Sequence, residues 1–342
     1  MTGRMLWRPV LSLALLGLLA AACGWPALPL PGRTGGQQAA VPGYRVARDV
    51  PLPGDTSRWD YQTPDASHRL YISHLGASEI VVFDTRLQRA LAVVSGVDQV
   101  HGLVLAPDRF FASATGRNQV DVVDTSTLKV GPGIATGNYP DGLAYVPGAG
   151  KVYVSNEHDS VDTVIDARSA RRLGSIKIGG DIGNSQYDPG TGRVYVASGS
   201  DNRLVVVDPN RDTVVERDPL PGCDGAHGVQ VDVPERGRVF VACEGNAKLA
   251  VLDLAARRVT DVMSVGDGPD VLALDPALHR LYVAPESGTL AVFDAGPQVR
   301  KLGSGNAGPN AHSVAADPGT HVVYLPLTDV GGHPVLRELV PT

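Results

Sequence analysis

The sequence predicts an all-β fold, a seven-bladed β-propeller of four-stranded antiparallel blades that is closed by pairing of its N- and C-terminal strands. Two observations carry this prediction: a short strand motif that returns every 40–45 residues, and turn residues between the apolar stretches. A period of about 40–45 residues with four short strands per unit is typical of a propeller blade. The 40 glycines and 26 prolines among 342 residues supply the tight turns that such a fold needs.

Residues 1–22 have the layout of a signal peptide. Arg4 and Arg8 form a basic start, and the apolar stretch that follows at 11–22 (LSLALLGLLAAA) is too short to span a bilayer. We therefore expect this segment to direct export and to be removed.

The end of this segment resembles a bacterial lipobox. Small residues from Ala20 to Ala22 lead directly into Cys23, and Ala20 stands where the motif usually has Leu. The resemblance implies that Cys23 carries lipid as the first mature residue, and Gly24 after it implies sorting to the outer membrane. We expect a periplasm-facing lipoprotein; the alternative is cleavage after Ala22 without lipid, which gives a soluble periplasmic or secreted protein.

Residues 23–43 are rich in Pro, Gly and Gln and lack periodicity, which predicts a flexible tether between the anchor and one domain at 44–342. Loss of the two leader arginines takes the formal net charge from −6 to −8. An acidic chain without a basic run has no long-range attraction for nucleic acid. We expect no nucleic-acid partner, membrane attachment only through the lipid, and a monomeric propeller.

Two features recur in the repeats. One short apolar strand of each repeat contains an aromatic residue, at Tyr71, Phe111, Tyr153, Tyr195, Phe240, Tyr282 and Tyr324. The next strand ends in an aspartate, at Asp84, Asp124, Asp166, Asp208, Asp253 and Asp294. Because these residues are shared by the repeats, we expect structural roles: the aromatic rings pack between sheets and the aspartates hold turns.

The fourth repeat shows the strand order most clearly, with strands expected at 183–188, 194–198, 204–208 and 213–216. The C-terminal part offers only three strands, at 312–316, 321–326 and 335–340. A strand at 44–50 supplies the missing outer one, and its pairing with the C-terminal part closes the ring without exposed edges.

The third repeat carries a family resemblance. YVSNEHDSVDTVID at 153–166, preceded by GNYPDGLAYVP at 137–147, resembles the YVTN repeat of the YncE-like seven-bladed propellers. The resemblance spans about 44–340 and implies the fold. Relatives in the wider superfamily include amine dehydrogenase subunits, lactonases and binding or surface proteins, so the resemblance does not select an activity.

Comparison of the repeats also predicts the site. The residue that opens the first strand varies from repeat to repeat: Asp60, His101, Asp141, Gly183, His227, Asp270 and His312. The first strand of a blade is the innermost, so these residues should ring one mouth of the central channel. The loops after the second strands open on the same face and add His74, Glu157, His158, Asp201, Glu244 and Glu286. Imidazoles and carboxylates bind metals, protons and polar ligands; the alternative is solvated polar residues beside a water-filled channel.

We expect the mouth to bind a small polar ligand, a peptide or a partner protein. The candidate ligand-binding residues are His101, Asp141, His158, His227, Glu244, Asp270 and His312. No cofactor is predicted, and the sequence lacks a nucleophile elbow, a phosphate loop and a haem-attachment motif, which favours binding over catalysis. The alternative is a transition metal held by His101, His227 and His312, in a lactonase-like metal-assisted hydrolase or a propeller component of a periplasmic redox system.

Cys223 and Cys243 occur in the fifth repeat only. In an oxidising compartment, two remaining cysteines at this spacing predict a disulfide, which would hold the loops beside His227. The alternative is a pair of thiols available for metal or redox chemistry.

Overall fold

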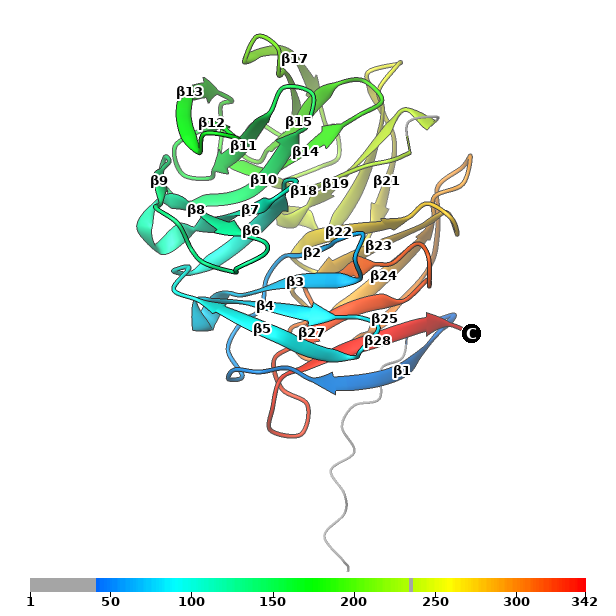
Figure 1. Cartoon of the computed structure of the whole chain (residues 1–342). Coiled ribbons are helices and arrows are strands. Elements are labelled where there is room, and N and C mark those ends of the chain that lie inside the picture. Colours follow the sequence, from blue (N-terminus) through cyan, green and yellow to red (C-terminus); the bar gives the residue numbers. More distant parts are fainter. Residues whose placement is uncertain (1–40, 234–235) are drawn as a thin grey trace, which may run out of the picture. The chain divides into compact units, whose positions relative to one another are not determined.

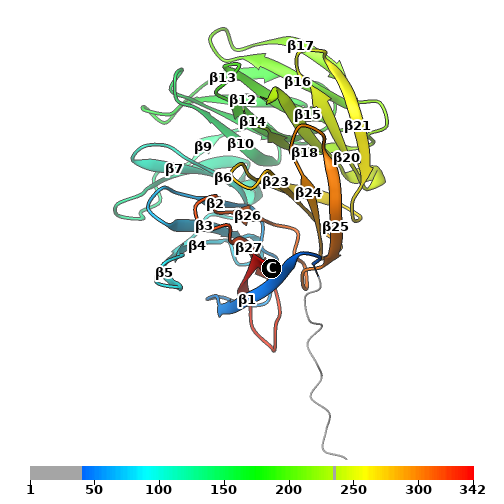
Figure 2. The same ribbon diagram turned by 90° about the vertical axis from the view of Figure 1, so that its right-hand side faces the viewer.

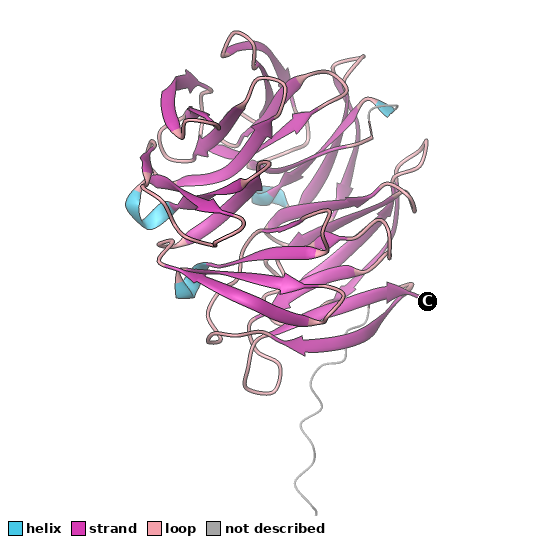
Figure 3. Cartoon of the chain, viewed as in Figure 1, coloured by secondary structure: helices cyan, strands magenta, loops and turns pink. Residues whose placement is uncertain are grey.

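The computed structural model describes residues 41–233 and 236–342, and the regular secondary structure of this part of the chain is almost entirely β-strand, with loops and turns between the strands (Figure 3). Seven four-stranded antiparallel sheets surround a central axis as the blades of a propeller (Figures 1 and 2). The predicted signal segment, Cys23 and the tether up to residue 40 lie outside the described residues. No helix within the described ranges is long and apolar enough to cross a membrane.

Blades one to six each run outward from the axis in chain order. Blade one is β2 (Gln62–Pro64), β3 (Arg69–His74), β4 (Glu79–Asp84) and β5 (Arg89–Ser95). Blade two is β6 (Val100–Leu105), β7 (Arg109–Ala114), β8 (Gln119–Asp124) and β9 (Ile134–Ala135). Blade three is β10 (Pro140–Val146), β11 (Lys151–Asn156), β12 (Val161–Asp166) and β13 (Arg171–Lys177).

Blade four is β14 (Ile182–Asp188), β15 (Arg193–Ser198), β16 (Arg203–Asp208) and β17 (Thr213–Pro219). Blade five is β18 (Ala226–Val231), β19 (Arg238–Cys243), β20 (Lys248–Asp253) and β21 (Arg258–Ser264). Blade six is β22 (Pro269–Asp275), β23 (Arg280–Pro285), β24 (Thr289–Asp294) and β25 (Arg300–Asn306). The expected strands of the fourth repeat are confirmed to within three residues at each end.

Blade seven joins the two ends of the domain, as predicted. Its order from the axis is β26 (Ala315–Ala316), β27 (Val323–Leu327), β28 (Val335–Pro341) and β1 (Tyr44–Pro51). The outermost strand therefore comes from the N-terminal end of the domain and pairs antiparallel with β28 (Figure 1). The innermost strand is shorter than the expected 312–316, so His312 precedes it.

An ion pair reinforces the closure of the ring. The guanidinium of Arg337 on β28 donates two hydrogen bonds, of 2.7 and 2.6 Å, to the carboxylate of Asp49 on β1. It donates a third, of 3.0 Å, to the carbonyl of Ala307 after blade six. Arg337 is only 7% exposed, so this two-pronged contact is held away from water and ties the closing strand to two blades.

The repeated residues are structural. The seven strand aromatics are at most 3% exposed and pack between blades. The carboxylate of Asp84 accepts hydrogen bonds from the N–H groups of Arg86 and Leu87, both at 2.8 Å, and so holds the turn after β4. Blade two departs from the repeat because its outer strand is reduced to β9. The preceding Gly-Pro-Gly at 131–133 weakens strand pairing, since Pro donates no ladder hydrogen bond.

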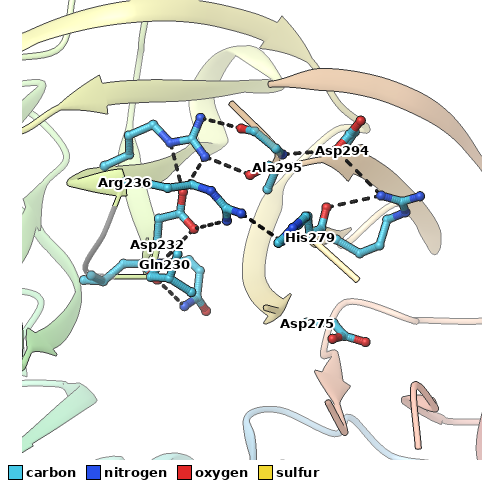
Figure 4. A network of polar contacts seen from close by, with 12 residues as sticks. Gln230, Asp232, Arg236, Asp275, His279, Asp294 and Ala295 are labelled. Atoms are coloured by element: carbon cyan, nitrogen blue, oxygen red, sulfur yellow. Dashed lines mark hydrogen bonds and ion pairs between the residues drawn. The ribbon is translucent and has the colours of Figure 1, made fainter. Parts of the chain in front are cut away.

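A buried arginine connects blades five and six at the end of the ring opposite the predicted mouth. Arg238 lies 2.9 Å from the carboxylate of Asp232 and donates to the carbonyls of Ala295 and Gly296 after β24. Next to it, Arg236 contacts Nδ1 of His279 at 2.8 Å (Figure 4). These polar contacts fix neighbouring blades relative to each other where apolar packing ends.

The predicted disulfide is present. Cys223 and Cys243 are bonded, with their Cα atoms 5.3 Å apart, and both side chains are buried. The bond joins the loop before β18 to the end of β19, at the face where the innermost strands begin.

We expect replacement of both cysteines by Ala to lower the free energy of unfolding by about 3 kcal/mol, because the bond closes a loop of some 20 residues in the unfolded chain. Guanidinium unfolding of the oxidised protein and of the Cys223→Ala/Cys243→Ala variant measures the difference. Addition of a reductant should destabilise the oxidised protein and leave the variant unchanged. Equal sensitivity of both proteins to the reductant would contradict the presence of the disulfide.

Candidate functional site at the channel mouth

The structure brings the predicted strand-opening residues together around one end of the central axis, which we call the channel mouth. We call the set the mouth ring: Asp60, His101, Asp141, Gly183, His227, Asp270 and His312. Each lies at or just before the start of an innermost strand. Five of its side chains are buried, and His227 is 17% exposed, so the ring is a polar cluster set below the surface.

The innermost strands approach each other very closely at this end. A Cβ atom on Gly183 would lie 2.5 Å from the backbone of His227, and one on Gly228 would lie 1.9 Å from the carbonyl oxygen of Asp270. Any side chain at these positions would force the blades apart. This crowding explains why the fourth blade contributes Gly to the mouth ring, and it is what presses the other members against one another.

His227 lies between two carboxylates. Its Nδ1 is 3.2 Å from Oδ1 of Asp270 and its Nε2 is 3.8 Å from Oδ2 of Asp141. Burial disfavours the charged ring, but the hydrogen bond and charge of Asp270, followed by the charge of Asp141, outweigh it and raise the pKa of His227 to about 10. Burial likewise opposes ionisation of Asp270, yet contact with His227 lowers its pKa to about 2. The two form an imidazolium–carboxylate pair at neutral pH.

The remaining carboxyls of the ring are held in a different state. Burial, then the charges of Asp270 and Asp141, raise the pKa of Asp60 well above its ordinary value. Burial raises the pKa of Asp141 to about 7, although His227 opposes this. Burial also lowers the pKa of His101 to about 4 and that of His312 below its ordinary value. With a single imidazolium among three crowded carboxyls, the ring has an excess of negative charge that protons or a bound cation must offset.

The rim above the ring is acidic as well. The ring opens into a cavity of about 150 Å³ that Glu157, Glu244 and Glu286 also line. Arg58, the lining residue that carries a fixed positive charge, pairs with Glu286 at 2.9 Å. A second hollow of about 270 Å³ shares Glu157, His227 and Glu244 and adds the carboxylates of Asp181 and Asp224. Carboxylates thus predominate over the whole mouth.

The predicted loop residues divide into three groups. Glu157, Glu244 and Glu286 line the mouth, as expected. His158 is exposed and stacks on Tyr139, with ring centroids 4.5 Å apart, so it lies beside the cavity. His74 and Asp201 differ from the expectation: His74 is buried inside blade one, stacked 3.8 Å from Trp59, and Asp201 is not among the residues that line either hollow.

Sequence comparison missed two residues below the ring. Tyr61 donates a 3.0 Å hydrogen bond to Oδ1 of Asp270 and contacts the side-chain amide of Asn184. It lines both the mouth cavity and a channel space of about 310 Å³ beneath it, so it forms the floor between them. The sequence does contain a signal for Tyr61. The residue that follows the mouth-ring position is Gly in three repeats, whereas it is Tyr61 in the first repeat.

Two sets of three side chains offer donor atoms within 4.8 Å of one another, a spacing suited to a metal ion. They are Asp60, Asp270 and His312, and Asp141, Glu157 and His227. Each set found in the described residues contains a single histidine. His101, His227 and His312, the alternative metal ligands from the sequence, do not occur together in either set.

No protein-family model and no curated protein matches this chain. Its fold, in contrast, matches 1715 chains of solved structures. One is a chain of the mitotic checkpoint complex, with a TM-score of 0.72, 10% identity and coverage of 96% of this chain and 99% of that one. Another belongs to hydrazine synthase of Kuenenia stuttgartiensis, with a TM-score of 0.68, 17% identity and coverage of 91% and 99%. At such identities the likeness shows the seven-bladed propeller fold alone.

We expect the imidazole of His227 to remain protonated at pH 8, and that of His101 to be neutral at pH 6. Histidine-selective ¹⁵N NMR of protein dialysed against a chelator measures both. In the Asp270→Asn variant the pKa of His227 should fall, because its closest carboxylate is lost. Because the folded-state pKa of His227 is raised and that of Asp270 is lowered, the stability that this pair supplies is complete between about pH 4 and pH 6.5. It is lost as pH rises through about 10 or falls through about 2. A neutral His227 at pH 8 would contradict the pairing.

Proposed function

We propose that this chain is an exported, lipid-anchored binding propeller of the YVTN-repeat kind, and that its channel mouth captures a positively charged group of a small ligand, a peptide or a partner protein. The observation that carries the proposal is the excess of carboxylates in and above the mouth ring. Asp60, Asp141 and Asp270 are buried below a rim that bears Glu157, Glu244 and Glu286.

The physical argument starts from the cost of this arrangement. Each buried carboxyl that lacks a partner reduces stability, so a cluster of them is expected where a ligand repays the cost. Oδ1 of Asp60 and Oδ1 of Asp141 have no hydrogen-bond partner among the described residues. A bound cation would satisfy such an oxygen and would be drawn into the cavity by the surrounding field.

The fold agrees with a binding role. Propellers present their loops around a channel mouth on a rigid scaffold, which is a common site for ligand capture.

Binding of spermidine, a small organic cation, tests the proposal by isothermal titration calorimetry. We expect Glu157→Gln to weaken binding about fivefold, since a partly exposed ion pair contributes up to about 1 kcal/mol. Added salt should weaken it further.

The charge-matched control is Asp261→Asn, which removes an exposed carboxylate on the outer strand β21. It should leave the affinity unchanged. Absence of binding to the unmodified protein, or an equal loss in both variants, would contradict capture of a cation at the mouth.

The anchor is tested separately. We expect the Cys23→Ser variant to move from the membrane fraction to the soluble fraction of the producing bacterium and to lose radiolabelled palmitate, because the thioether that carries the lipid cannot form. Unlabelled wild-type protein in the soluble fraction would show that the cysteine is not lipidated.

A further inference from the structure

The carboxyl group of Asp60 faces two histidine rings, and each is too far away for a hydrogen bond. Its Oδ1 lies 3.9 Å from Nε2 of His312, and its Oδ2 lies 3.9 Å from Nε2 of His101. Both gaps exceed hydrogen-bond length. Asp60 is 1% exposed and His312 is fully buried, yet Oδ1 and the facing Nε2 of His312 have no hydrogen-bond partner among the described residues. A hydrogen-bond donor and an acceptor would approach each other to a shorter distance. Two atoms that face each other with lone pairs repel each other and stay apart.

The outer hydrogen bonds of the rings show which atoms carry the lone pairs. Nδ1 of His312 lies 3.2 Å from the carbonyl oxygen of Asn310, and Nδ1 of His101 lies 2.9 Å from that of Gln99. A carbonyl oxygen only accepts, so each Nδ1 carries the hydrogen. The neutral ring then presents an unprotonated Nε2 toward Asp60, which is the orientation of a histidine that binds a metal.

The two histidines differ in one respect. The hydroxyl of Tyr139 lies 3.2 Å from Nε2 of His101 and donates to it, so that nitrogen is satisfied within the protein. Nε2 of His312 has no such partner. The structure therefore leaves one imidazole nitrogen, that of His312, directed at Asp60 and free to coordinate.

We propose that Asp60, Asp270 and His312 bind a divalent transition-metal ion at the floor of the mouth. Their donor atoms lie within 4.8 Å of one another. A metal about 2.0–2.2 Å from nitrogen and oxygen ligands fits between atoms 3.9 Å apart. One imidazole and two carboxylates are the ligands of Zn²⁺ and its neighbours in the transition series rather than of Mg²⁺ or Ca²⁺.

The other set of three is the weaker candidate, because both ring nitrogens of His227 already face carboxylates, those of Asp270 and Asp141. A metal can reach the proposed site through the mouth cavity, which Asp60 and Asp270 line, whereas His312 is fully buried. The proposal deepens the proposed function, on which it rests, by naming the class of cation.

The test uses the whole exported chain in detergent, freed of metal with a chelator and titrated with Zn²⁺ alone. We expect one ion per chain, and a loss of affinity in His312→Gln greater than the roughly 10–100-fold typical of a change outside the ligand shell. The matched control is His321→Gln. This histidine pairs with Asp275 at 2.8 Å, in the turn before β27, and should leave the affinity unchanged. Zn²⁺ binding that survives His312→Gln but not Glu157→Gln would place the metal at the other set and overturn the proposal.

A second measurement does not depend on the folding of a variant. Proton NMR of the Co²⁺-loaded wild-type chain should show one paramagnetically shifted, exchangeable imidazole N–H, that of Nδ1 of His312. No such signal, or two, would overturn the ligand set. Spermidine binding without metal binding would leave the proposed function standing and defeat the metal site; His312-dependent Zn²⁺ binding without spermidine binding would support the metal and defeat capture of organic cations.

Discussion

The close approach of the seven innermost strands is the constraint on which the mouth depends. Where β14 meets β18, and β18 meets β22, there is no room for a Cβ atom on Gly183 or Gly228. Side chains next to these contacts cannot spread apart, and so carboxyls and imidazoles from six blades share a space that water would otherwise fill. The unusual electrostatics of the ring follow from backbone packing, not from any single charged residue.

The crowding also explains why protons are divided unequally among like groups. Asp60, Asp141 and Asp270 are all buried carboxyls, yet only Asp270 has an imidazole within 3.2 Å. It keeps its charge, and burial followed by the charge of Asp270 raises the pKa of Asp60. Among the histidines, His227 takes the proton because it has two acidic neighbours, whereas His312 is fully buried with a ring nitrogen left over. Residues of the same type in different repeats therefore differ in charge state because their neighbours in the ring differ.

Most of the fold could be predicted from the sequence, because each blade repeats the same local pattern and a repeat needs only its neighbours to define its place. The ring residues could be predicted for the same reason, as positions that vary where the blades are otherwise alike. The direction of individual side chains could not. The repeat pattern assigns His74 to the loop, yet it is the last residue of β3, as Cys243 is of β19, and its side chain is buried and stacks on Trp59. The contacts of Tyr61 could not be predicted, because its partners, Asp270 and Asn184, lie 209 and 123 residues away.

The use of β1 as the outer strand of the last blade has a consequence for biogenesis. This strand precedes every other strand of the domain in the chain, yet it pairs only with β28, the final one. Six blades can assemble in order as each hairpin is completed, whereas β1 must stay unpaired until the C-terminal strand β28 is available. During that interval an edge is open to neighbouring chains. Maturation of this protein is therefore most prone to aggregation, and depends most on chaperones, while this one eight-residue strand is unpaired. The stability of the finished ring does not determine this risk.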